Sequence, residues 1–188
     1  MRFRVLAVVV LLAALCGLPA ASASADSGSA SYQYLIGTGV LCTLGIPNAC
    51  PDVARAPNGD TIALAGQGTL SIHPQSVTGG GTFTHRSATG QVLGKGTWTA
   101  LDLLAFQDYG PSTDPTFPAT FRAGRALIRI HLSPAAGGPG FNGILEVTCH
   151  LPGAKVPQGG EEGIRLNVQG VANFHETVSG VTLFIRQP

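Results

Sequence analysis

Five histidines give this chain of 188 residues its widest chemical range, because an imidazole can transfer a proton near neutral pH and can also bind a metal. They are His73, His85, His131, His150 and His175. No His-x-His, His-Glu-x-x-His or Cys-x-x-Cys pair occurs, so a metal would need ligands from distant strands. We therefore expect each histidine to have a surface or structural role, and we predict neither a metal nor a cofactor.

Three polar side chains share one face of an alternating segment: Arg125, Arg129 and His131. If this face points into the protein, they form a basic cluster, which Glu146 or Asp102 could complete for binding an anion or polarising a carbonyl. If it points outward, they are solvated charges. The aliphatic residues that alternate with them favour the outward orientation, because apolar faces turn inward. His131, Arg129 and Glu146 are the candidate catalytic residues if the protein is an enzyme.

Other catalytic and binding motifs are absent or weak. The sequence has no Gly-x-Ser-x-Gly nucleophile elbow. Glu161 and Glu162 are adjacent on a Gly-rich loop, where carboxylates are normally solvated rather than paired for glycoside hydrolysis. The Gly-rich segments 79–81 and 137–140 do not lead into a helix that could bind phosphate. Trp98 fits a core position better than a platform for stacking sugars.

The cysteines predict one disulfide and one free thiol. Cys42 and Cys50 flank a segment with one glycine and one proline, which would let the chain turn back, so we predict a local disulfide between them. Cys149 is in phase with Leu145 and Val147, which indicates a small buried side chain rather than a reactive nucleophile. A long-range bridge from Cys149 to Cys42 or Cys50 remains open, because a sequence does not fix the connectivity.

The first residues have the three parts of a cleavable signal peptide. A basic start is followed by an uncharged apolar run over residues 5–18 and by Ala23-Ser24-Ala25, which supplies the small residues of a cleavage site. We predict cleavage after Ala25, with cleavage after Ala23 as the near alternative. Residues 1–25 are thus assigned to the signal peptide, and the protein is predicted to be secreted.

The mature chain, residues 26–188, has the length of a single domain. It keeps nine basic and ten acidic residues once Arg2 and Arg4 are removed, so it has no positive field for nucleic acid or an anionic membrane. No later segment has the roughly 20 apolar residues of a membrane span. Leu15 stands before Cys16 where a lipidation signal would need a small residue, so no lipid anchor is expected.

Strand patterns dominate the mature chain, and no stretch sustains the apolar spacing of an amphipathic helix. The proline-rich residues 110–118 and the Gly/Pro-rich residues 152–163 are expected to form loops. Eight strands joined mostly by short turns predict an all-β fold, an antiparallel eight-stranded barrel, with a β-sandwich as the alternative. The predicted strands are 32–41, 61–72, 77–86, 91–106, 122–133, 141–151, 164–174 and 176–186.

Four blocks of sequence resemble a group of uncharacterised secreted β-rich proteins of filamentous fungi and soil bacteria. These blocks are residues 58–62, 76–85, 96–100 and 126–132. The resemblance implies a secreted β-rich protein and carries no activity. In its strand meander and its Gly-x-Gly-Thr segments the chain more loosely resembles the dirigent and allene oxide cyclase barrels, which implies a fold, since no catalytic motif of those families is present.

These observations favour a secreted barrel that binds a small apolar or amphipathic ligand, because eight strands enclose enough room for one small molecule. The alternatives are a cyclase, isomerase or lyase with its site at the barrel mouth, and a structural or interaction module of the cell surface. Neither the ligand nor the oligomeric state follows from the sequence.

Overall fold

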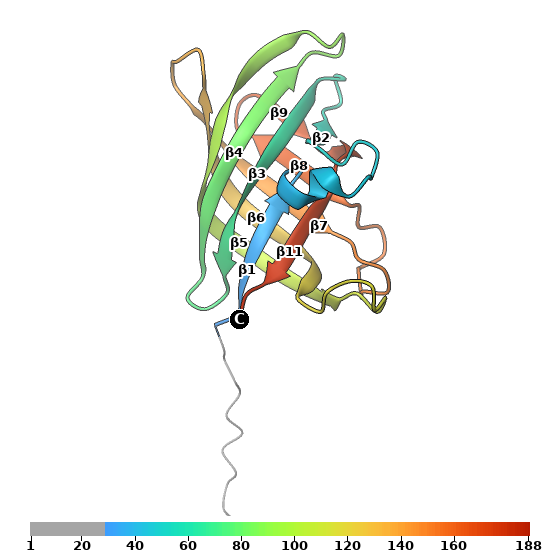
Figure 1. The fold of residues 1–188 in the computed structure, drawn as a ribbon. Helices are drawn as coiled ribbons and strands as arrows, with labels where there is room; N and C mark the ends of the chain where they lie inside the picture. Colours follow the sequence, from blue (N-terminus) through green and yellow to red (C-terminus); the bar gives the residue numbers. More distant parts are fainter. Residues whose placement is uncertain (1–28) are drawn as a thin grey trace, which may run out of the picture.

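A computed structural model describes residues 29–188. The predicted signal peptide and Cys16 lie outside the described residues. The fold is all-β, as predicted, and its eleven strands pair antiparallel within one sheet (Figure 1). The strands are β1 (Ser31–Ile36), β2 (Asp52–Arg55), β3 (Thr61–Ser71), β4 (Ser76–Arg86), β5 (Val92–Pro111), β6 (Phe121–Pro134), β7 (Phe141–Cys149), β8 (Gly163–Val168), β9 (Ala172–Phe174), β10 (Glu176–Ser179) and β11 (Thr182–Arg186).

Two routes of hydrogen-bonded strands connect β3 with β6. One route passes through β4 and β5, and the other passes through β1 and β11. The part of β3 that extends past β1 pairs with β2, and β2 also pairs with β10. Beyond β11, β6 pairs with β7, and the sheet continues to β8 and β9. Both edges of β3 and of β6 are therefore occupied by neighbouring strands.

Glycines interrupt three of the predicted segments, and two of these segments each form two strands, so the prediction of eight strands was wrong. The first predicted strand ends at Ile36, where Gly37 takes a φ of +45°, and a short 3₁₀ helix, η1 (Gly39–Thr43), follows. The segment 164–174 divides at a turn containing Gly170 (φ +74°), and the segment 176–186 divides at Gly180 (φ +119°). Left-handed backbone of this kind ends a ladder and favours glycine.

In addition, β2 was not predicted, and β5 is longer than the predicted strand 91–106. The ladder of β5 extends to Pro111 because three register shifts let the strand follow the curvature of β6. Only the residues after Pro111 form the predicted proline-rich loop. The neighbouring strand β6 is the one whose alternation was clearest, and its observed bounds differ from the predicted ones by a single residue at each end.

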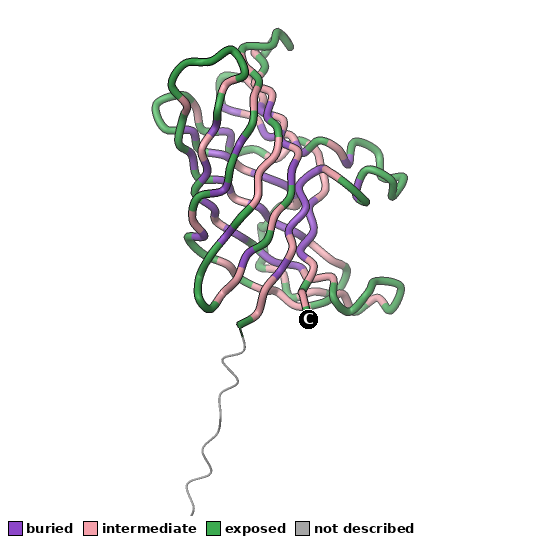
Figure 2. Tube along the Cα trace, turned by 60° about the vertical axis from the view of Figure 1, so that its left-hand side comes forward, coloured by how far each residue is buried: buried purple, intermediate pink, exposed green. Residues whose placement is uncertain are grey.

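The interior is packed with the apolar faces of the strands. On β6 the aliphatic residues are buried and the arginines between them are exposed, so the predicted outward orientation is confirmed. Figure 2 shows the buried residues interspersed with less buried ones along the strands and the exposed loops at their ends. Trp98 is 1% exposed, and its Nε1 donates to the carbonyl of Ala65 at 3.3 Å, which satisfies its polar atom.

The disulfide prediction is confirmed: Cys42 and Cys50 are bonded, with their Cα atoms 5.5 Å apart. Cys149 is a buried free cysteine at the end of β7. Between residues 29 and 188 we find no helix with the length and apolar character that crossing a membrane requires.

Candidate functional site

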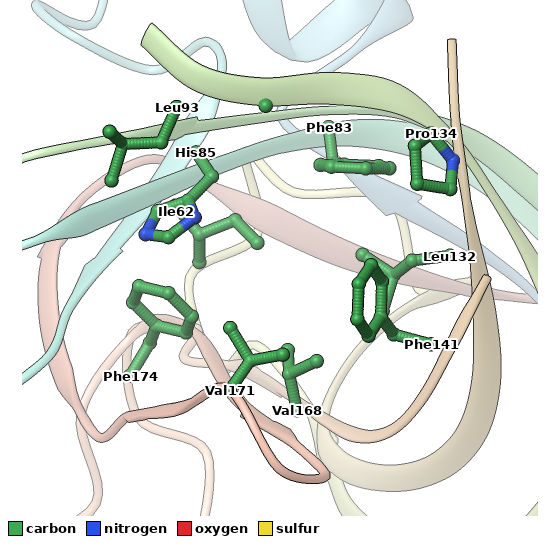
Figure 3. A pocket seen from close by; sticks show the side chains of 11 residues that line it. Ile62, Phe83, His85, Leu93, Leu132, Pro134, Phe141, Val168, Val171 and Phe174 are labelled. Carbon is green, nitrogen blue, oxygen red and sulfur yellow. The ribbon is translucent and has the colours of Figure 1, made fainter. Parts of the chain in front are cut away.

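A cavity lies at the end of the sheet that carries the β4–β5, β6–β7 and β8–β9 turns, which is the upper end in Figure 1. Its volume is about 250 Å³. Figure 3 shows the lining side chains arranged around this space. They are Ile62, Phe83, His85, Leu93, Gly94, Leu132, Pro134, Phe141, Val168, Val171 and Phe174. We call this space the apolar cavity.

The apolar cavity has a closed floor and an exposed rim. Ile62, Leu132 and Phe174 are at most 2% exposed and belong to the core of the sheet. At the rim, Leu93 is 52% exposed and Val171 is 47% exposed, although both have large apolar side chains. Exposed apolar groups around a hollow are characteristic of a binding site rather than of ordinary surface.

The pairing register of β3, β4 and β5 places His85, the polar residue of the cavity, in its lining. His85 on β4 pairs with Ile62 on β3 and with Gly94 on β5, so all three share the face that lines the cavity. The ring of Phe174 packs edge-on against His85, with centroids 5.4 Å apart and an angle of 84° between the planes. The imidazole is therefore held by apolar contacts on the cavity side.

Asp60 lies behind His85, just before β3 begins. Its Oδ2 is 3.4 Å from Nε2 of His85, an ion-pair separation rather than a hydrogen bond, because Nε2 makes no hydrogen bond of acceptable geometry. Its Oδ1 accepts from the Ala88 N–H at 3.1 Å. The preceding turn is fixed as well, since Asn58 Oδ1 accepts from the Asp60 N–H at 3.1 Å. One oxygen of the Asp60 carboxylate is thus held by a hydrogen bond, and the other lies near His85.

The candidate catalytic residues lie on the outer face of the sheet. Arg129 is exposed and pairs with Asp102, and His131 Nδ1 is 3.0 Å from Asn142 Oδ1. Glu146 accepts from Arg125 at 2.6 Å and from Arg165 at 3.3 Å. None of these side chains lines the apolar cavity. Their assignment to catalysis stays a prediction.

The remaining histidines are scattered over the fold. His73 and His175 are exposed, at the β3–β4 turn and between β9 and β10. His150 follows β7, and partial burial lowers its pKa. Among residues 29–188, no group of three His, Cys, Asp or Glu side chains is placed to bind a metal ion.

A second polar cluster is buried, and the sequence did not indicate it. Both carboxyl oxygens of Asp52, on β2, are sealed from solvent without a hydrogen-bond partner among the described residues. Burial and the nearby charge of Glu162 raise the pKa of Asp52 to about 8. The N–H of Gly37 opposes this shift only weakly, since it already donates to the carbonyl of Val181 at 3.1 Å.

Glu162 is the other acid of this cluster, so the expectation that it would be solvated was wrong. It accepts from the backbone N–H groups of His150 and Thr182 and from the Thr182 hydroxyl. Burial raises its pKa to about 7 despite these hydrogen bonds. Its neighbour Glu161 is exposed and pairs with Arg165. The cluster joins β2, β11 and the loop that leads into β8.

No family model, curated protein or solved structure matches this chain. The resemblance to secreted β-rich proteins and the looser likeness to dirigent and allene oxide cyclase barrels stay predictions.

Proposed function

We propose that this protein is a closed antiparallel barrel whose open end binds one small, mainly apolar molecule. Closure is supported by the two routes of paired strands that connect β3 with β6. Each sheet of a sandwich ends in two edge strands, whereas the pairs β1–β3, β3–β4, β4–β5, β5–β6, β6–β11 and β11–β1 form a ring that returns to its start. The packed interior supports a barrel that is filled by side chains over most of its length and hollow at one end.

The apolar cavity is the observation that carries the binding proposal. Ten of its eleven lining residues are apolar or glycine. An apolar cavity of about 150 Å³ is known to bind benzene, so one of about 250 Å³ with an open rim has room for a molecule of two or three rings. Burial of such a ligand would be favourable by about 25 cal/mol for each Å² of apolar surface removed from water.

We further propose that the protein acts outside the cytoplasm, after removal of residues 1–25. The Cys42–Cys50 disulfide supports this location, because disulfides persist in oxidising compartments. A ligand in this setting would be taken from the medium or from a surface, so an accessible cavity mouth is required, and the exposed Leu93 and Val171 meet that requirement.

The test is titration of the purified protein with N-phenylnaphthylamine, a neutral dye whose fluorescence rises in apolar surroundings. Native mass spectrometry would give the stoichiometry, expected to be one. Gly94→Leu is the blocking variant, because Gly94 lines the cavity and a Cβ there meets nothing within 4 Å. Lys95→Leu is its matched control, since the neighbouring side chain is exposed on the same strand.

We expect Gly94→Leu to lose most dye binding while it remains folded, and Lys95→Leu to bind like the wild type. Equal loss in both variants, or binding that Gly94→Leu leaves unchanged, would contradict the assignment of the cavity. Absence of dye binding to the wild-type protein would contradict the proposed function itself.

A further inference from the structure

His85 is the one lining residue of the apolar cavity with a polar side chain. The other lining side chains can select a ligand only by shape and apolar area. A single polar group among apolar ones fixes the orientation of a ligand and imposes a chemical requirement on it. The properties of this imidazole therefore decide which apolar molecules the cavity accepts.

The environment of His85 makes its two ring nitrogens different. Nε2 is sealed from solvent and lies 3.4 Å from Oδ2 of Asp60. We assign the proton of the neutral ring to Nε2, because the negative charge of the Asp60 carboxylate, 3.4 Å away, favours a proton on that nitrogen. Nδ1 then carries a lone pair and can only accept a hydrogen bond.

Nδ1 is the nitrogen that remains for a ligand. It has no hydrogen-bond partner among the described residues and, unlike Nε2, it is not a sealed atom. Figure 3 shows the imidazole among the side chains that surround the cavity, beside Ile62 and above Phe174. A ligand that covers Nδ1 without donating to it would leave a desolvated acceptor unpaired, which is unfavourable.

We propose that the cavity selects neutral, mainly apolar molecules that carry one hydrogen-bond donor, an N–H or O–H group, which donates to Nδ1 of His85. This inference rests on the proposed function, since it names the ligand class of the same site. Anionic ligands are disfavoured because the lining contains no lysine or arginine, and Asp60 places a negative charge behind the ring.

Asp60 acts in this scheme as a positioning residue. Its Oδ1 is held by the Ala88 N–H, so its Oδ2 remains directed at His85. Replacing the acid with the amide in Asp60→Asn keeps an oxygen for the Ala88 N–H but removes the charge that favours a proton on Nε2. Nitrogen NMR of the imidazole reports which ring nitrogen carries the proton, independently of fold stability.

Three bicyclic probes of nearly the same shape test the requirement for a donor. Indole donates through its N–H, benzofuran has an oxygen in that position and can only accept, and indene can do neither. Calorimetric titration of each into wild-type protein should give indole the highest affinity, by about fivefold, the typical gain from one neutral hydrogen bond.

His85→Phe is the variant for the same titrations, because a phenyl ring fits among Phe83 and Phe174 and offers no acceptor. We expect it to bind all three probes with similar affinity. Asp60→Asn should shift the proton of His85 away from Nε2 and weaken the preference for indole, while leaving the affinity for indene unchanged.

Several outcomes would overturn the inference while the proposed function stands. The wild type could bind the three probes with equal affinity, or bind none of them while still binding N-phenylnaphthylamine. It could also bind cinnamate, an anionic probe, more tightly than indole. A wild-type ring protonated on Nδ1 would also overturn it. Failure to bind the dye as well as the probes would instead contradict the proposed function.

Discussion

Gly66 on β3 lies against the ring of Trp98 on β5: a Cβ atom at Gly66 would be 2.5 Å from Cζ2 of the indole and would also clash with the carbonyl of Gly80. The largest buried side chain of the core therefore occupies space that a side chain at Gly66 would need. This close packing gives one reason for glycine in the Gly-x-Gly segments: the absence of a side chain leaves room for the Trp98 ring against β3.

Gly66→Ala should lower the free energy of unfolding by about 1–3 kcal/mol, because the methyl group overpacks a filled interior. Gly94→Ala is the control, since a Cβ there meets nothing within 4 Å. We expect its stability to be unchanged or raised by up to about 1 kcal/mol, through the lower entropy of the unfolded chain. Urea denaturation measures both, and equal stabilities of the two variants would contradict the packing described.

Stability should fall as the pH rises from about 5 to 9, because Asp52 and Glu162 keep their protons in the folded protein with pKa values of about 8 and 7. The unfolded chain releases these protons near pH 4, so it binds fewer protons across this window and gains stability relative to the folded state as the pH rises. The slope of Tm against pH measures the effect.

Asp52→Asn should flatten this slope, because the amide keeps the shape of the neutral acid and does not titrate. In this variant Glu162 still titrates, so a smaller slope of Tm against pH should remain and should end a little above pH 7. Asp102→Asn, at an exposed pair with Arg129, is the control and should keep the wild-type profile. A slope that Asp52→Asn does not change would show that Asp52 is ionised in the folded protein.

The opposite sign is expected for Asp108, at the end of the sheet far from the cavity. Burial acts to raise its pKa, but hydrogen bonds from Arg122, Gly110 and Tyr32 outweigh burial and hold the pKa below its usual value. Two of these donors are Arg122 Nη2 at 2.8 Å and the Tyr32 hydroxyl at 2.9 Å. The stabilisation is present above about pH 4 and is lost as acid protonates Asp108.

Asp108→Asn should therefore lower the free energy of unfolding at pH 7 by about 2 kcal/mol, since it weakens charge-assisted hydrogen bonds in a partly buried site. Asp102→Asn should cost less than about 1 kcal/mol, because the Arg129–Asp102 pair is half exposed. Equal losses in the two variants would mean that the Arg122–Asp108 pair is no stronger than a surface pair.

Cys149 should be the only thiol of the mature protein, and it should react only after unfolding. It is buried, and burial together with the charge of Glu162 raises its pKa, so little of the reactive thiolate is present. Thiol counting without reductant should give no reactive group in native protein and one in guanidinium. Cys149→Ala should give none in either state. Three thiols in the unfolded wild-type protein would contradict the Cys42–Cys50 disulfide.

The fold could be predicted from sequence wherever a strand alternates cleanly. In β6 the inward residues are aliphatic, so both the strand and its orientation were predicted. β2 escaped because its two inward positions are Asp52 and Ala54, which give no apolar alternation. The room for this carboxyl depends on a tertiary contact that the sequence does not show: a side chain at Gly180 would overlap the Asp52 carboxyl.

The candidate site was less predictable, because its residues come from seven strands, β3 to β9, and from the turn between β8 and β9. His85 was one of five histidines with no distinguishing neighbour. What sets it apart is its register opposite Ile62 and Gly94 and the carboxylate behind it, which depend on strand pairing. The residues that alternation did bring together, Arg129 and His131, lie on the outer face.

The pairing of β1 with β11 has a consequence for how the chain acquires its structure. Tyr32 pairs with Leu70 of β3 on one side and with Arg186 of β11 on the other, so the second edge of β1 is covered only when the last strand has been made. A chain synthesised as far as Gly180 would expose one edge of β1 and one end of β6. Such long-range pairing makes folding slow, because these two strands can be joined only after nearly the whole domain has been made.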